Sequence, residues 1–252
     1  MLKKLMKYEL QATARSFLPS YGAFILICVI MRFTYSMQNV IQIGIDYGEF
    51  MVSEETPIFD FIYLGFAITY VPATIGMLAK APLFSVYRFY INLMKTEGYL
   101  MLTLPVKISQ HIWSKLHVMA FWMLASSAVT LLSILILSGG NVSVFVEILN
   151  TFDLLPLYLI IASIYTYVML GYASLAIGHK LFRKYPVLGA ILVFLIIFSV
   201  MQIVSLIIFP SIGITLTSSR ISFLVSTAML SLIFMFFYVI TTRIMTHSLN
   251  LE

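Results

Sequence analysis

Six apolar runs, each long enough to cross a membrane, limit what this chain can fold into. They cover residues 17–36, 59–78, 118–137, 155–177, 187–209 and 221–240. A helix needs about 20 apolar residues to cross the roughly 30 Å of hydrocarbon in a bilayer. The runs are continuous, whereas the strands of a transmembrane β-barrel alternate in hydrophobicity over about ten residues. The sequence therefore predicts an all-α, polytopic integral membrane protein with six transmembrane helices, forming a single transmembrane domain over residues 1–252.

The composition supports this fold class. Hydrophobic residues make up 61% of the 252 residues and charged residues only 10%, whereas soluble proteins are about half apolar and a quarter charged. The first 16 residues are basic and amphipathic, so we expect no cleavable signal peptide. Cys28 is the only cysteine of the sequence, which excludes an intrachain disulfide, and it lies inside an apolar run.

Charged residues predict the orientation of the six helices. One side carries Lys3, Lys4, Lys7, Arg15, Lys80, Arg88, Lys95, Lys107, Lys115, Lys180, Arg183, Lys184 and Arg243. The other side carries Asp46, Glu49, Glu54, Glu55, Asp60, Glu147 and Asp153, with Arg220 and Arg32. Basic residues concentrate in cytoplasmic loops, so we expect both termini in the cytoplasm. This placement of the basic residues at the ends of apolar runs also argues against a nucleic-acid-binding surface.

The first 16 residues have the pattern of an amphipathic helix. Lys3, Lys7, Gln11 and Arg15 recur every four residues, with apolar residues on another side. Such a helix lies in the membrane interface with its lysines toward anionic headgroups. The alternative is a solvated basic tail that only obeys the charge rule.

The longest cytoplasmic connection, residues 79–117, contains a short predicted helix outside the spans. Thr96 can cap this helix, Glu97 suits its positive end, and Pro105 ends it. Its apolar side would consist of Leu100, Met101 and Leu104. An exposed apolar cluster of this kind is typical of a docking surface. The alternative is a helical turn that packs back on its own bundle.

The stretch TEGYLMLTLPVKISQHIWSKL resembles the cytoplasmic segment of permease subunits of ATP-binding-cassette exporters of the type-two class. The residues that match this family are Glu97, Gly98, Leu104, Pro105 and Lys115. The opening KLMKYELQATARSFLPSYGAFIL and the closing RIMTHSLNLE look like small Gram-positive members of the same family.

This resemblance implies a set of partners and contact residues. Residues 1–16 would form an elbow helix at the surface of a bacterial plasma membrane. The main coupling helix, Glu97, Gly98, Leu100, Met101, Leu104 and Pro105, would dock in a groove of a separate ATPase subunit. His179, Lys180 and Arg183, between the fourth and fifth spans, would make a second contact. Two permease subunits would pair as a homodimer or heterodimer, and the ATPase subunits would bind ATP and Mg.

The sequence offers no candidate for catalysis. It has no G-x-x-x-x-G-K-[ST] phosphate loop, so ATP hydrolysis is expected in a partner chain and no cofactor in this one. The four histidines are scattered and lack metal-ligand spacing. We therefore expect a transport subunit that is not itself an enzyme, and neither a catalytic nor a metal site.

A few polar and aromatic residues inside the spans are candidates for a translocation path or a dimer contact. Gln202 lies near the middle of the fifth span, where it could line a path, bond to a second copy or tie two helices together. Tyr158, Tyr165 and Tyr172 follow each other at intervals of seven in the fourth span. They could face an amphipathic cargo, although helix packing is the more frequent reason for such a stripe.

Two further sets of residues favour structural roles. Arg32 could reach the membrane surface or pair with Asp60 at the outer ends of the first two spans. Ser126, Thr130 and Ser133 form a stripe of small polar residues in the third span, most simply a helix-packing face.

These observations favour an ATP-driven exporter whose membrane subunit moves an amphipathic cargo. An antimicrobial peptide, a drug or a lipid-linked molecule would fit, and the acidic outer side would suit a cationic peptide. The alternative is that the outer loops are acidic only because Lys and Arg stay on the cytoplasmic side. One alternative is an ion-coupled secondary transporter, although the acids lie at the ends of the spans and not near the midplane. Another is a membrane anchor or receptor that transports nothing.

Overall fold

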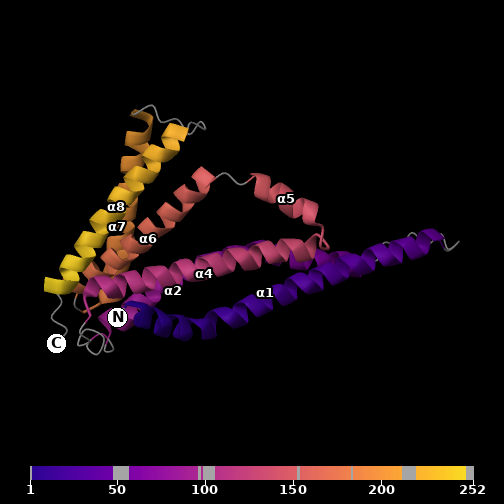
Figure 1. Ribbon diagram of the computed structural model, residues 1–252, viewed down its shortest axis with the longest axis horizontal. Coiled ribbons are helices and arrows are strands. Elements are labelled where there is room, and N and C mark those ends of the chain that lie inside the picture. Colours follow the sequence, from indigo (N-terminus) through magenta and orange to yellow (C-terminus); the bar gives the residue numbers. More distant parts are fainter. Residues whose placement is uncertain are drawn as a thin grey trace. The chain divides into compact units, whose positions relative to one another are not determined.

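The computed structural model describes residues 2–47, 57–95, 98, 106–151, 154–182, 184–211 and 220–247, and every regular element in them is helical. The helices are α1 (Leu2–Tyr47), α2 (Pro57–Met94), α4 (Ile108–Leu137), α5 (Val142–Thr151), α6 (Leu154–Leu181), α7 (Pro186–Ser211) and α8 (Arg220–His247). Figure 1 shows these helices, with colours that follow the sequence.

Six of these helices are long and apolar enough to cross a membrane, which confirms the predicted fold class. The membrane-length segments are Leu2–Ser36, Leu64–Met94, Ile108–Leu137, Pro156–Leu181, Pro186–Ser205 and Phe223–Thr246. Each overlaps one of the six predicted runs. The chain is therefore a multi-pass membrane protein.

The first helix includes the predicted amphipathic segment. Residues 1–16 are expected to lie in the membrane interface, and α1 runs through them from Leu2 to Tyr47, with Pro19 inside it. Proline removes one backbone donor and disturbs the preceding turn. The ammonium of Lys80 on α2 donates to the carbonyl of Ser16 at 2.6 Å and to the hydroxyl of Ser20 at 2.8 Å. These bonds tie α2 to the turn of α1 that contains Pro19.

Helix α5 was not predicted, although local capping signals surround it. The turn before it contains Gly139 and Gly140, whose φ angles are +69° and +81°. The amide of Gly140 donates to the carbonyl of Leu135 at 2.9 Å, which closes the end of α4 as in a Schellman motif. The side chain of Asn141 then accepts a bond from the amide of Ser143 at 3.2 Å and caps α5.

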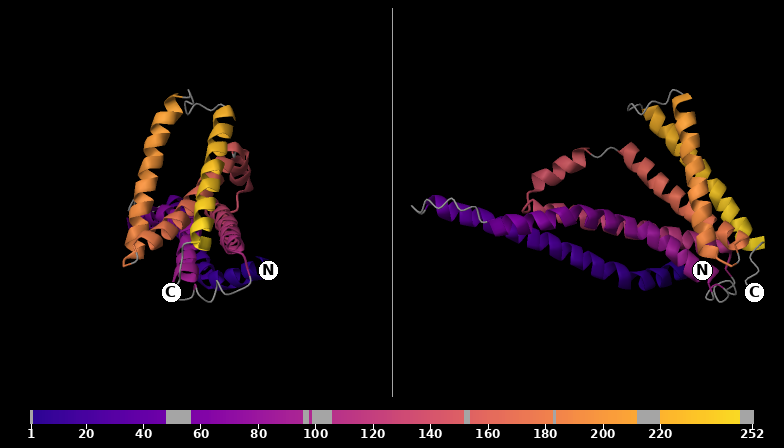
Figure 2. Two further views of the ribbon diagram at one scale, coloured as in Figure 1. Left: turned by 90° about the vertical axis from the view of Figure 1, so that its left-hand side faces the viewer. Right: turned by 180° about the vertical axis from the view of Figure 1, so that it is seen from behind.

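The helices group into two compact units. One, here called the N-terminal unit, contains Tyr8–Ala81 and Ala120–Thr151. The other, the C-terminal unit, contains Met1–Lys7, Pro82–Met119 and Phe152–Glu252. Within the C-terminal unit α6 packs against both α7 and α8, as the two views of Figure 2 show.

Candidate functional site

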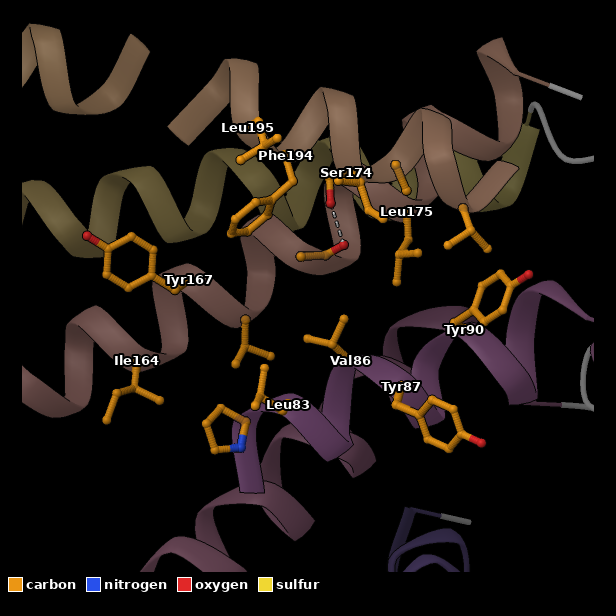
Figure 3. Close-up of a pocket in the computed structure, with 16 residues that line it drawn as sticks. Leu83, Val86, Tyr87, Tyr90, Ile164, Tyr167, Ser174, Leu175, Phe194 and Leu195 are labelled. Carbon is orange, nitrogen blue, oxygen red and sulfur yellow. Dashed lines mark hydrogen bonds between the residues drawn. The ribbon is translucent and has the colours of Figure 1, made fainter. Parts of the chain in front are cut away.

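The C-terminal unit contains an apolar groove with a volume of about 610 Å³. Its walls come from three helices, α2, α6 and α7 (Figure 3). The lining includes Leu83 and Val86 from α2, Tyr167 from α6, and Ile191 and Phe194 from α7. This volume is within the range of about 300–1,000 Å³ that is usual for small-molecule sites.

Small residues on α6 shape the floor of the groove. A side-chain carbon at Gly171 would lie 3.0 Å from Val86, so the glycine lets α2 and α6 approach closely. Ser174 is buried, and its hydroxyl donates to the backbone carbonyl of Gly171 at 2.9 Å (Figure 3). The one hydroxyl on the floor is thus satisfied by its own helix, and the surface that a ligand would meet is apolar.

Two lysines lie at the ends of helices that line the groove. The ammonium of Lys95 lies 5.5 Å from the ring centroid of Tyr90, a lining residue. The ammonium of Lys184 lies 5.5 Å from the ring of Tyr185, which precedes the start of α7. Figures 1 and 2 show that α2 and α6 end, and α4 and α7 begin, at this same end of the C-terminal unit. We call this the basic end.

The three tyrosines of the predicted stripe occupy three different environments. Tyr158 is 59% exposed, and Tyr165 is half-buried with its ring edge-on to Phe234. Tyr172 is fully buried: it shares a hydrogen bond with Ser85 and stacks on Phe89 at a centroid distance of 4.2 Å. Tyr172 therefore packs between α6 and α2, in agreement with the packing alternative.

Tyr167, which is off the predicted stripe, lines the groove, and the spacing of residues along α6 gave no signal for it. Gln202 is exposed on α7, and its backbone carbonyl accepts a bond from the Ser205 hydroxyl at 2.7 Å. An exposed amide on a membrane helix is costly unless it finds a polar partner.

The predicted coupling helix is only partly visible. Glu97, Leu100, Met101, Leu104 and Pro105 lie outside the described residues.

Gly98 is described, and its amide donates to the carbonyl of Lys95 at 2.7 Å. A side-chain carbon at position 98 would lie 2.7 Å from the carbonyl oxygen of Leu93, so there is room here only for a glycine. Lys115, the last of the residues that match the family, is 4% exposed, so its side chain is buried within the chain.

The second predicted contact lies where α6 meets α7. His179 is half-buried and Lys180 is exposed, while Arg183 is outside the described residues. A side-chain carbon at Gly178 would overlap the backbone of Ala190, so the two helices are in backbone contact here. This contact holds the α6–α7 connection at the basic end.

Polar side chains in the N-terminal unit bond to one another between helices. The hydroxyl of Tyr21 on α1 bonds to Ser126 on α4, and that of Tyr70 on α2 bonds to Ser133, each at 2.8 Å. Thr130 donates to the carbonyl of Ser126 at 2.9 Å. Ser126 and Ser133 are fully buried, which confirms the predicted helix-packing face.

Arg32 is also in the N-terminal unit, where its guanidinium lies against Gly139 in the turn that follows α4. A cation at this position is favourable because the last carbonyls of a helix carry partial negative charge. The side chain of Asp60, its predicted partner, is outside what the structure describes.

In the described part of the chain, no three His, Cys, Asp or Glu side chains are grouped so that they could hold a metal ion.

Comparison with known proteins gave no family. No protein-family model matches the chain, and neither a curated protein nor a solved structure does. Function must therefore be argued from the residues and their arrangement.

Proposed function

We propose that this chain is the non-catalytic permease subunit of an ATP-driven exporter in a bacterial plasma membrane. Both termini would be cytoplasmic, as would the basic end of the C-terminal unit. A separate ATPase subunit would bind ATP and Mg and would drive the movement of an amphipathic cargo, such as a peptide or a drug.

One observation carries the proposal. The end of α2 and the start of α4 lie at the same end of the C-terminal unit as the end of α6 and the start of α7 (Figures 1 and 2). The family resemblance assigns the two connections between these helix ends to ATPase contact. The close approach of Gly98 to Leu93 and of Gly178 to Ala190 would couple these connections to their helices, so a force on either would reach α2, α6 and α7.

Pairing of two permease subunits is part of the proposal. The exposed amide of Gln202 on α7 would find its hydrogen-bonding partner on the second subunit, which could be an identical or a related chain.

The experiment that tests the proposal is purification of the chain from native membranes together with its bound proteins. We expect a subunit with a phosphate loop to copurify and its ATPase rate to rise in the complex. Glu97→Lys and Leu104→Asp should each lower that association at least tenfold while the chain still inserts in the membrane. Val142→Asp is the control, since Val142 is an exposed apolar residue of α5, far in sequence from both connections.

Other outcomes separate the alternatives. Transport by the chain alone, driven by an ion gradient, would make it a secondary carrier. Stable copurification with a partner that has no nucleotide site, and no transport, would make it an anchor. Unchanged ATPase association in both coupling variants would overturn the assignment of residues 97–105.

A further inference from the structure

We propose that the groove of the C-terminal unit binds an acyl chain of one anionic phospholipid, with the lipid phosphate at Lys95 and Lys184. The inference is separate from the proposed function, because it requires neither an ATPase nor a cargo.

The position of the groove suits a lipid. On α7 it is lined from Val187 to Leu195, which is the beginning of that helix, and on α2 from Pro82 to Tyr90, which is the end of that helix. The groove therefore occupies the half of these helices nearest the basic end. Tyr87 and Tyr90 mark its end, with their hydroxyls pointing away from the apolar walls (Figure 3). Tyrosines at this level are typical of the membrane–water interface.

The charges at the mouth of the groove favour an anion. Lys95 and Lys184 are exposed; Lys95 lies over the ring of Tyr90, which lines the groove, and Lys184 precedes Val187, the first lining residue of α7, by three positions. None of the residues that the structure describes in the C-terminal unit is an Asp or a Glu. Glu97, two positions after Lys95 in the sequence, is outside them. A lipid phosphate at this end would meet two cations while its chain fills the apolar groove.

Electrostatics and not apolar contact would select the lipid. Lipid tails are as apolar as the groove walls, so filling the groove does not by itself distinguish one lipid from another. A lysine near the membrane surface improves binding of an anionic headgroup about fivefold. The two lysines together predict a preference for an anionic over a zwitterionic lipid on the order of 25-fold.

The same charges argue against a second copy of this chain in the groove. Two parallel subunits in a membrane have their basic ends at the same level. Pairing through this groove would bring Lys95 and Lys184 of both copies together, and such like charges repel.

Native mass spectrometry of the full chain in detergent micelles tests the proposal. The probes are phosphatidylglycerol and phosphatidylcholine with identical acyl chains, added separately and in competition. We expect one phosphatidylglycerol to be retained per chain, with the preference given above. The double variant Lys95→Gln/Lys184→Gln should reduce that preference to within about twofold of unity. The control double variant Lys3→Gln/Lys4→Gln changes two exposed lysines that do not line the groove and precede no lining helix, and it should leave the preference unchanged.

A second pair of variants tests the acyl-chain site. Ile191→Trp fills the groove and should lower retention of either lipid at least fivefold. Ile203→Trp changes an equally exposed isoleucine of the same helix outside the groove and should have no effect. Equal loss in both tryptophan variants, or an undiminished preference without Lys95 and Lys184, would overturn the proposal. So would a chain dimer that forms through position 191, or displacement of the lipid from the wild-type chain by a cationic peptide alone.

Discussion

A buried hydrogen bond between α1 and α4 offers a direct test of how α1 is held. The indole Nε1 of Trp122 donates to the Thr13 hydroxyl at 2.7 Å, and both residues are buried. Phe17 stacks on the same indole with ring centroids 4.5 Å apart. Thr13→Val keeps the shape of the side chain and removes the acceptor, so the indole N–H loses this partner in an apolar setting.

The expected cost follows from the burial of the donor. A buried donor left without an acceptor costs about 1–3 kcal/mol. Interhelical hydrogen bonds in a bilayer average about 0.6 kcal/mol and reach about 1.7 kcal/mol. Since this bond is short and its surroundings are fully packed, we expect Thr13→Val to destabilise the protein by about 1–2 kcal/mol. That is about 5- to 30-fold in the unfolding equilibrium.

A double-mutant cycle isolates the bond. Trp122→Phe removes the donor, but the Thr13 hydroxyl still donates to the carbonyl of Glu9 at 2.8 Å. The coupling energy between the two substitutions should therefore be close to the cost of Thr13→Val. Unfolding by sodium dodecyl sulfate in mixed micelles, followed by circular dichroism, measures all four proteins.

The matched control is Thr69→Val on α2. The Thr69 hydroxyl is exposed and donates only to the carbonyl of Phe66 in its own helix, at 2.9 Å. We expect this substitution to cost less than about 0.5 kcal/mol. If Thr13→Val were no more costly than Thr69→Val, or the coupling energy were below about 0.3 kcal/mol, α1 would not be packed on α4 as described.

Two pairs of glycine substitutions give further predictions. Gly178→Leu would force α6 away from the backbone of Ala190 and should destabilise the protein by about 2–3 kcal/mol in the same assay. Gly22→Leu, at a position that faces open space on α1, should cost less than about 1 kcal/mol, and equal costs for the two variants would contradict the close contact. Gly139→Ala should cost about 1–2 kcal/mol because its φ is positive and its side chain would also displace Arg32. Gly140 also has a positive φ but has open space around it, so Gly140→Ala measures the backbone strain alone. A larger cost for Gly140→Ala than for Gly139→Ala would refute the contribution of Arg32.

The number and approximate position of the spans were predictable, because the length and continuity of an apolar run are local properties. The contacts around Pro19 were not. The ammonium of Lys80 bonds to Ser16 and Ser20 on either side of this proline, although Lys80 is more than 60 residues away in the sequence. No local pattern could have indicated that contact.

The groove could not be predicted for the same physical reason. The spacing of Tyr158, Tyr165 and Tyr172 correctly placed them on one side of a helix, but a period carries no information about which helix lies opposite each turn. α6 meets α2 at Tyr172 and α8 at Tyr165, and Tyr158 is exposed. Tyr167 lines the groove because α7 brings Phe194 and Leu195 to the same place, and this pairing depends on tertiary packing alone.

The polar group at the groove differs from those that join helices, and this difference has a consequence for binding. In the N-terminal unit, hydroxyls such as that of Tyr21 bond across helices, so these contacts fix the helices to one another. At the groove, by contrast, the Ser174 hydroxyl bonds to its own helix and leaves an apolar wall. An apolar wall cannot select among amphipathic molecules in a membrane, because the lipid around it is equally apolar. Selection must therefore come from the polar groups at the end of the groove, where we propose that Lys95 and Lys184 hold an anionic headgroup.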